Sequence, residues 1–245
     1  MIRDDLGEPY TAGPPRRVVS LVPSTTEAVA PTGLLVGATD YCTHPADLAV
    51  ARVGGSKYPA LEKILALRPD VVLANAEENR REDVEALRAA GLTVWVSLPR
   101  TVEEALDAAA RMFAHALHLP EPAWIAAARE AWREPVPATR RAAVPIWRKP
   151  WMVAGAGTFA ADVLLRLGVT NVFEGATYPK TTPGEILALR PDLIVLPDEP
   201  YAFTAQDGPE AFPGVPCALV SGRHLTWHGP SLVEAREVLA AALVI

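Results

Sequence analysis

The sequence has little cysteine: two residues in a chain of 245, Cys42 and Cys217. Two thiols exclude a disulfide framework and a zinc-finger pattern, and we expect both to be small, partly buried side chains. No apolar run approaches the roughly 20 residues that a membrane-spanning helix needs. Catalytic signatures are missing too: there is no glycine-rich phosphate loop, no Gly-x-Ser-x-Gly and no His-Glu-x-x-His. The sequence therefore predicts a binding protein rather than an enzyme.

Positive charge is in the minority. The 23 lysines and arginines face 29 aspartates and glutamates, for a net charge of -6, and this balance argues against nucleic acid as the general partner. The start of the chain contains neither the apolar segment nor the small-residue cleavage site of a signal peptide, and no cysteine there could carry a lipid. The sequence as it stands predicts a cytoplasmic protein. A start that is processed or truncated would make it extracytoplasmic.

Short apolar runs alternate with amphipathic stretches along most of the chain, a pattern that predicts parallel sheets with helices on both faces. The first 15 residues, rich in Pro and Gly, are expected to form a loose arm. The predicted strands are residues 17–22, 70–74, 93–97, 143–147, 192–196 and 215–220. The predicted helices start from a capping box at Ser24–Glu27 and then cover 79–90, 102–118, 123–133, 158–167 and 232–243.

An internal repeat is the most informative feature. The segment Ile-Leu-Ala-Leu-Arg-Pro-Asp occurs at residues 64–70 and again at 186–192. In each copy a short helix ends at the arginine, the proline prevents the helix from continuing, and the aspartate opens an apolar strand. The same joint at matching places predicts two α/β lobes of similar topology. We place the first lobe at 16–100, a helical linker at 101–137 and the second lobe at 138–245.

Four segments carry a family resemblance: Arg17–Glu27, Val53–Gly55, Leu61–Asp70 and the second Leu-Arg-Pro-Asp at 189–192. In this order they look like the helical-backbone substrate-binding proteins of ABC importers, which are receptors for cobalamin, ferric siderophores, heme and some bare metals. The resemblance implies two Rossmann-like lobes with parallel sheets, joined by a helical linker. It also implies that the ligand binds in a cleft between the lobes.

The resemblance further implies a permease partner, because in the family one acidic residue on each lobe pairs with arginines of the permease. Glu62 matches the first such position, whereas in the second copy Gly184 occupies it and Glu185 follows one residue later. Both glutamates have a simpler explanation: Glu185 completes a capping box that starts at Thr182, and Glu62 lies in a first helical turn that favours acids. We expect a small-molecule ligand, an ABC permease and a monomeric protein.

Ligands of parallel α/β proteins bind beyond the carboxyl ends of strands, so the loops that follow strands form the candidate site. The strongest pattern is Trp147-Arg-Lys-Pro-Trp151, in which two rings that can stack on a flat ligand bracket two cations that can pair with its anionic groups. Packing of the tryptophans beneath a loop is the alternative. The predicted ligand-binding residues are Tyr41, Lys57, Tyr58, Asn75, Arg80, Trp147, Arg148, Trp151, Tyr178, Lys180, Tyr201 and Trp227.

Arg80 is included because it conflicts with a local rule. Asn79 fits the start of a capping box, which puts Arg80 and Arg81 in the first helical turn, where cations oppose the helix dipole. Neutralisation by Glu77 and Glu78 on a solvated surface is the alternative.

A bare metal site would need three or four ligands, and His44, His224 and His228 could contribute to one only if both lobes took part. His224 and His228 are expected in a loop without carboxylates nearby, and so are not expected to bind a ligand by themselves. The leading hypothesis is a receptor for a metal-bearing organic ligand such as a corrinoid or an iron chelate, with no covalently bound cofactor. The alternatives are a cytoplasmic binding or sequestering protein without a permease, a receptor for bare Zn, Mn or Fe, and an enzyme that uses the cleft.

Overall fold

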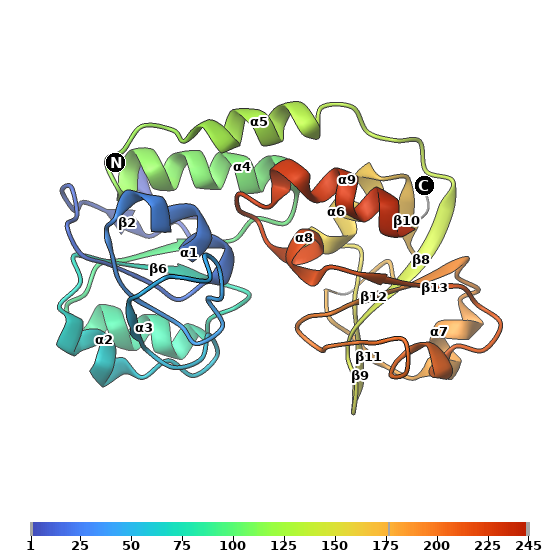
Figure 1. The fold of residues 1–245 in the computed structure, drawn as a ribbon. Helices are drawn as coiled ribbons and strands as arrows, with labels where there is room; N and C mark the ends of the chain where they lie inside the picture. Colours follow the sequence, from blue (N-terminus) through green and yellow to red (C-terminus); the bar gives the residue numbers. More distant parts are fainter. Residues whose placement is uncertain (1, 176, 244–245) are drawn as a thin grey trace. The chain divides into compact units, whose positions relative to one another are not determined.

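The computed structural model describes residues 2–175 and 177–243 (Figure 1). The chain divides into two compact units, which we call unit 1 and unit 2, and each unit contains separate stretches of the sequence. Unit 1 consists of the residues up to Pro99, of Glu104–Ala126 and of His228–Pro230. Unit 2 consists of Arg100–Glu103, of Ala127–Trp227 and of the residues from Ser231 onward. Within the described ranges, no helix has the length and apolarity to cross a membrane.

Unit 1 is built on a five-stranded sheet in which every neighbouring pair is parallel, as the alternating pattern predicts. In spatial order its strands are β5 (Ala51–Arg52), β4 (Leu35–Ala38), β3 (Val18–Ser20), β6 (Val71–Asn75) and β7 (Val94–Ser97). Its helical segments are α1 (Pro23–Val29), a 3-10 turn (Ala30–Thr32), α2 (Leu61–Leu67) and α3 (Arg81–Ala89). Helix α4 (Val102–Arg111) continues as a π-helical turn (Met112–Ala116), and α5 (Ala123–Ala131) follows it.

Both faces of this sheet are buried. Val71 and Leu73 of β6 pack in one apolar cluster with Val29 of α1 and with the α4 segment. Val72 and Ala74 point the other way and pack in a second cluster with residues of α2 and α3. Because side chains alternate between the faces of a strand, a continuous run of apolar residues is what a two-sided core requires.

The amino-terminal residues are not a loose arm, and that prediction is wrong. Strands β1 (Ile2–Arg3) and β2 (Pro9–Tyr10) form an antiparallel hairpin. The Asp4 carboxylate at its turn is buried and accepts hydrogen bonds from the backbone of Leu6, Glu8 and Val96, and it pairs with Arg88 at 2.8 Å. The Tyr10 ring contacts Trp95 edge-on, and its hydroxyl donates to the Ala116 carbonyl. The hairpin is therefore part of the core of unit 1.

Unit 2 contains a mixed sheet, where a parallel one was expected. Strands β10 (Val169–Asn171), β8 (Arg140–Trp147), β12 (Leu193–Pro197) and β13 (Cys217–Val220) pair in parallel. After β8 the chain turns back, so β9 (Trp151–Ala154) and β11 (Lys180–Thr181) are antiparallel. The helical segments are α6 (Phe159–Arg166), α7 (Pro183–Ala188), a 3-10 turn (Pro209–Ala211), α8 (Gly222–Thr226) and α9 (Leu232–Leu243).

The repeated segment forms the same joint in both units, which confirms two α/β folds of related topology. Each copy ends a helix, α2 or α7, and leads into a strand in the interior of its sheet, β6 or β12. The first residue of each copy, Ile64 or Ile186, is completely buried. The arginines of the two copies, Arg68 and Arg190, both adopt a left-handed conformation, with φ of 45° and 51°. This conformation ends the helix and redirects the chain.

The aspartate of each copy fastens the joint to the neighbouring strand. The Asp70 carboxylate accepts the backbone N–H groups of Arg16 and Arg17 at 2.7 and 2.8 Å. The Asp192 carboxylate accepts the corresponding N–H of Arg141 at 2.8 Å. Both aspartates also donate their own N–H to the same residue, Arg17 or Arg141, at 2.8 Å. In each copy the carboxylate thus accepts hydrogen bonds from backbone N–H groups at the amino end of the neighbouring strand.

Helix starts were predicted with mixed success. Thr158 caps α6 as expected, because its hydroxyl accepts the N–H of Ala161. The capping box expected at Ser24 is absent, since α1 begins one residue earlier at Pro23, a residue suited to a first helical turn. Asn79 does not cap α3 either, because the helix starts after Arg80 without a side-chain cap.

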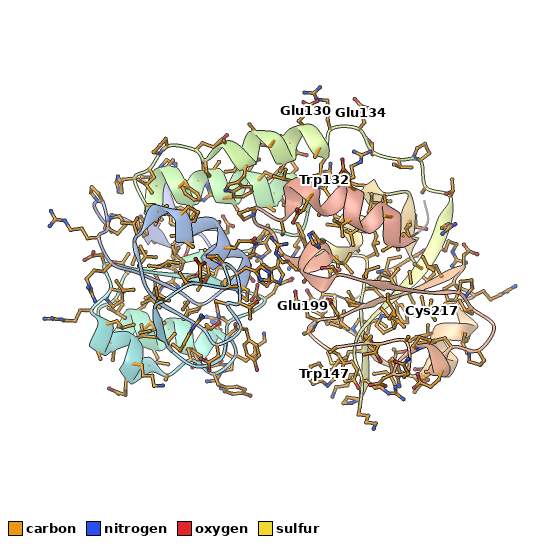
Figure 2. All side chains as sticks on the ribbon, in the orientation of Figure 1. Glu130, Trp132, Glu134, Trp147, Glu199 and Cys217 are labelled. Carbon is orange, nitrogen blue, oxygen red and sulfur yellow. The ribbon has the colours of Figure 1, made fainter. Side chains whose placement is uncertain are left out.

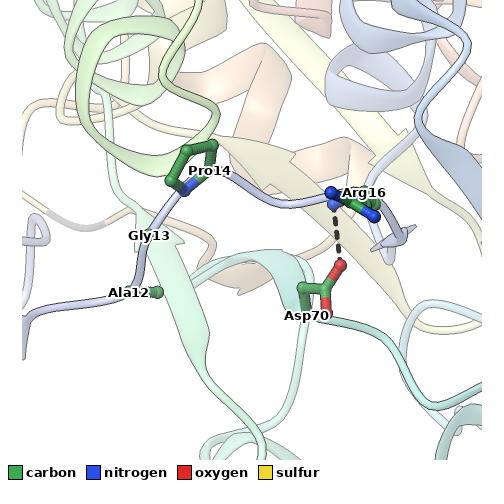
Figure 3. Close-up of a pocket in the computed structure, with 5 residues that line it drawn as sticks. All are labelled: Ala12, Gly13, Pro14, Arg16 and Asp70. Atoms are coloured by element: carbon green, nitrogen blue, oxygen red, sulfur yellow. Dashed lines mark hydrogen bonds between the residues drawn. The ribbon is translucent and has the colours of Figure 1, made fainter.

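An open depression at the amino end of β6 is lined by Ala12, Gly13, Pro14, Arg16 and Asp70 (Figure 3). Its single polar contact in this view is the bond from the Arg16 backbone to Asp70, which belongs to the joint described above. The depression lies at the sheet edge opposite to the carboxyl ends of the strands, and we do not assign a ligand to it.

Candidate functional site

The carboxyl ends of the parallel strands carry the exposed aromatic side chains. Six Trp, five Tyr and five Phe residues occur in the chain, and all lie in its described part. Four of them are exposed: Tyr41, Tyr58, Trp147 and Tyr178, with exposed fractions of 66%, 73%, 42% and 38%. They follow or end β4, β5, β8 and β10. We call these loop regions the carboxyl edge of unit 1 and the carboxyl edge of unit 2.

The carboxyl edge of unit 1 is organised by two buried amides. Asn75, the last residue of β6, accepts the backbone N–H groups of Glu77 and Glu78 with its side-chain oxygen, which shapes the following loop. Asn79 accepts the Asn75 N–H and donates to the backbone carbonyls of Leu21 and Ser56 at 3.2 and 2.9 Å. Asn79 is needed for these contacts, which is why it does not cap α3.

His228 lies against this amide network. Its Nδ1 is 3.2 Å from the Ser24 hydroxyl, and its Nε2 is 3.4 Å from the Asn75 amide and 3.9 Å from a Glu78 carboxylate oxygen. Burial lowers the pKa of His228 to about 4, so the ring is neutral near pH 7. The segment is closely packed, because a Cβ at Gly229 would lie 2.7 Å from the Ser24 carbonyl oxygen.

The predicted cations of unit 1 already have partners. Arg80 forms two hydrogen bonds with Asp83, at 2.7 and 2.8 Å, and its guanidinium lies 4.5 Å from the centre of the Tyr58 ring. The Asp83 hydrogen bond raises the pKa of Arg80. Lys57 donates to the Glu77 carbonyl at 2.5 Å. The alternative explanation for Arg80 therefore named the wrong acids, because Asp83 and not Glu77 or Glu78 pairs with it.

An aromatic hairpin dominates the carboxyl edge of unit 2. Trp147 ends β8 and Trp151 begins β9, so the tryptophans flank a β-turn rather than the strand-to-helix loop expected from the sequence. Trp151 stacks on Phe203 at 5.9 Å and meets Phe212 edge-on at 5.3 Å. Trp147 stands further out and touches Tyr201 edge-on at 5.8 Å, and Figure 2 shows it at the end of unit 2 away from Trp132. Trp151 is thus largely a packing residue, whereas Trp147 offers a free ring face.

Arg148 lies within this cluster and is paired twice. It forms ion pairs with Asp207 and with Glu210, the latter at 2.6 Å, and its guanidinium lies 5.2 Å from the Trp151 ring centre. The hydrogen bond with Glu210 raises the pKa of Arg148. The Tyr201 hydroxyl donates to the second Asp207 oxygen at 2.6 Å, and this bond raises the pKa of Tyr201.

The remaining predicted residues of unit 2 differ in accessibility. Tyr178 is exposed, and Lys180 lies in β11 opposite Met152 with an exposed side chain. Trp227 is buried at 7% exposure with the Arg223 guanidinium 5.9 Å from its ring centre, so its ring has little surface to offer a ligand.

The histidines do not form a metal site. No group of three or more His, Cys, Asp or Glu side chains in the described ranges could hold a metal ion. His224 lies in the short helix α8 rather than in a loop, 2.8 Å from the Ser221 hydroxyl and 3.1 Å from Glu234. The expectation that carboxylates are lacking near His224 and His228 is therefore wrong. His44 is close to the Thr43 hydroxyl.

Comparison with known proteins decides the family. The model of a family described as periplasmic binding protein matches residues 18–212.

The chain belongs to the periplasmic binding protein family.

Among its relatives is the Vitamin B12-binding protein of Photorhabdus laumondii, which is 29% identical over 199 residues, 74% of this chain and 70% of the relative. Two solved structures share the fold. The periplasmic Vitamin B12 binding protein BtuF of Vibrio cholerae has a TM-score of 0.75 at 22% identity, covering 94% of this chain and 97% of the other. The periplasmic heme-binding protein BhuT in complex with two hemes has a TM-score of 0.76 at 25% identity, covering 94% and 98%.

The two glutamates expected to dock a permease differ in this binding protein. Glu185 forms the capping box predicted for it, since it accepts the Thr182 N–H at 2.8 Å while the Thr182 hydroxyl accepts the Glu185 N–H. Hydrogen bonds to the carboxylate from the Thr182 and Thr181 hydroxyls and from the Thr182 N–H lower the pKa of Glu185. Glu62 lies exposed in the first turn of α2. The Glu62 carboxylate is therefore less engaged in helix capping than that of Glu185.

Several residues that shape the edges of this binding protein were missed. Asp207 and Glu210 lie in the segment between β12 and β13, Glu210 in the 3-10 turn, and nothing in their local sequence indicates that they pair with Arg148, 59 residues away in the case of Asp207. Ser24 and Asn79 were read as helix caps, and their tertiary contacts override that local preference. Cys42 is completely buried as a free thiol, close to the expectation for it, and burial raises its pKa.

Proposed function

We propose that this protein is the substrate-binding receptor of an ABC importer for a metal-bearing organic ligand, either a corrinoid, a heme or an iron chelate. It binds the ligand without covalent attachment and without catalysis. The observation that carries the proposal is that the four exposed aromatic side chains either end a parallel strand, as Trp147 does, or lie in loops that follow one. Elsewhere in the described chain, the protein buries its aromatic rings wholly or partly.

Exposed rings in this position are suited to flat or rigid metal complexes. Exposing a large apolar ring to water is unfavourable, and aromatic anchors are typical of ligand and partner sites. Open α/β folds bind their ligands beyond these strand ends. A corrin or porphyrin offers a wide surface for ring stacking, which a bare metal ion does not. The vitamin B12-binding and heme-binding names of the relatives support the same ligand class.

As a receptor of this kind, the protein would act as a monomer outside the cytoplasm and hand its ligand to a permease. Glu62 is the acid that we assign to permease docking, with Glu185 as a weaker candidate because its carboxylate is engaged in the α7 cap. The absorbance spectrum of protein purified from its native host tests the ligand class directly, since corrinoids, hemes and ferric catecholates are all coloured.

Replacing Trp147 by Ala provides a sharper test. We expect a loss of affinity for cyanocobalamin or hemin of roughly ten- to a hundred-fold, the usual effect of removing a stacked aromatic anchor. Equilibrium dialysis read by ligand absorbance measures this without relying on tryptophan signals. Leu165→Ala is the matched control, because Leu165 is similarly exposed at 48% but lies in α6 near the amino ends of the strands. Equal affinities for both variants would contradict the proposal.

A further inference from the structure

Three arginines at the carboxyl edges are paired with carboxylates, whereas Arg52 at the end of β5 donates to the backbone carbonyls of Thr39, Cys42 and Leu48. Arg148 is paired with both Asp207 and Glu210, Arg80 with Asp83, and Arg223 with Glu234 at 3.1 Å. A carboxylate that is paired with a guanidinium offsets the positive charge with which the guanidinium would attract a ligand anion. Two carboxylates thus face the single charge of Arg148, and Lys149, next to it in the chain, adds one exposed cation.

The other charged side chains at these edges are of both signs. In unit 1, Glu77 and Glu78 follow β6, and the one nearby lysine donates to the Glu77 carbonyl. In unit 2, Lys149 and Lys180 are exposed, and a hydrated lysine contributes little to holding an anion. Asp198 follows β12 and is occupied with the Gly222 N–H at 2.6 Å. The carboxyl edge of unit 2 thus combines the exposed Trp147 ring with a guanidinium whose charge is already offset by two carboxylates.

We infer that the carboxyl edge of unit 2 selects an uncharged or cationic metal macrocycle over a polyanionic chelate. This inference rests on the proposed function and narrows it. Stacking on Trp147 is indifferent to ligand charge, whereas the carboxylates beside Arg148 repel an anion that approaches this ring. A corrinoid without net negative charge fits this pattern. A ferric tris-catecholate does not, because its three negative charges would need free cations.

The experiment compares four probes by equilibrium dialysis: uncharged cyanocobalamin, cationic aquacobalamin, hemin with its two propionates, and the ferric tris-catecholate trianion. We expect the two cobalamins to bind at least about ten-fold more tightly than the trianion, a difference of about 1.4 kcal/mol. Added salt should reduce the discrimination against the trianion, because screening weakens repulsion between exposed charges.

The double variant Asp207→Asn, Glu210→Gln tests the cause. It leaves Arg148 in place and unpaired, so the affinity for the tris-catecholate should rise about ten-fold while that for cyanocobalamin changes by less than about three-fold. The control Glu134→Gln, Glu237→Gln removes the same charge from exposed positions of unit 2, in the segment before β8 and in α9, and should leave both affinities unchanged. Circular dichroism and thermal melting establish that both variants are folded.

The outcomes separate the two proposals. If the tris-catecholate or hemin binds the native protein as tightly as cyanocobalamin, the charge selection is wrong and the receptor function stands. If no metal chelate of any charge binds, both proposals fall. If the Asp207, Glu210 variant gains no affinity for the anion, compensation of Arg148 is not the cause of the selection.

Discussion

Unit 1 and unit 2 share a joint and differ at their edges. Both place the same seven residues between a helix and an interior strand, with a buried isoleucine, a left-handed arginine and an aspartate that accepts hydrogen bonds from the strand beside it. At the carboxyl ends, unit 1 has buried amides and a buried histidine, and unit 2 has a packed aromatic hairpin.

The difference shows which part of the fold tolerates change. The joint lies at the amino ends of the strands, where it sets the spacing of helix and sheet, so its residues are constrained by geometry. The carboxyl edges lie where ligands of such folds bind, so the residue types there can vary with the ligand that is bound. The following predictions test the comparison, from the largest expected effect to the smallest.

The largest expected difference concerns His228 at the edge of unit 1. Its pKa of about 4 in the folded protein lies below the ordinary value of 6.5, so the unfolded chain binds more protons between these pH values. The free energy of unfolding should therefore have its full value above about pH 6.5. It should fall by at most about 3 kcal/mol as the pH drops to about 4. Urea denaturation across this range measures the effect.

The variant His228→Gln removes the titrating ring and keeps groups that can bond to Ser24 and Asn75. Its stability should depend less on pH than that of the native protein over the same interval. Parallel pH profiles for the two proteins would show that His228 is not buried in its neutral form.

The loss of stability on removing the aspartate of each joint should follow the number of hydrogen bonds that its carboxylate accepts. Asp70→Ala and Asp192→Ala should each cost roughly 1–2 kcal/mol, with the larger loss at Asp70, which accepts two backbone N–H groups where Asp192 accepts one. Chemical denaturation of both variants measures this order. Asp→Asn at each position keeps one acceptor oxygen and should recover part of the loss. A larger cost at Asp192 would contradict the comparison.

The smallest expected effect lies at the starts of the two helices. Thr182→Ala removes the cap of α7 and should destabilise it by about 1 kcal/mol. Helix α2 begins after Ala60 without a side-chain cap, so Ala60→Ser should stabilise α2 by a similar or smaller amount. Hydrogen exchange of the amides in the first turn of each helix reports both changes. Equal protection before and after substitution would show that the caps do not distinguish the two units.

Local patterns predicted the elements whose causes are local. The repeat located α2, β6, α7 and β12 because proline and aspartate act on their immediate neighbours, and Thr158 was recognised as a cap for the same reason. The amino-terminal hairpin was missed because its cause is remote. Asp4 is held by Arg88 and by the backbone of Val96, which are 84 and 92 residues away in the sequence, and no neighbouring residue indicates these contacts.

The sequence could predict which aromatic side chains are exposed but not how the charges beside them are paired. All four exposed aromatic residues were among the predicted ligand contacts, because a strand end followed by an aromatic residue is visible in sequence. The pairing of Arg148 with Asp207 and Glu210 was not visible, because it depends on how the loop after β12 folds back on the hairpin. The sequence therefore presented Arg148 as a cation available to a ligand, whereas the structure pairs it with two carboxylates.

The segment His228–Pro230 belongs to unit 1, although the chain on either side of it belongs to unit 2. On the ribosome, Ser24 and Asn75 are made early and their partner His228 is made near the end of the chain. The two units therefore cannot mature one after the other during translation. A fragment that stops at Ala126 would lack the residues that close the amide network of unit 1, so unit 1 reaches its final form only after almost all of unit 2 has been synthesised.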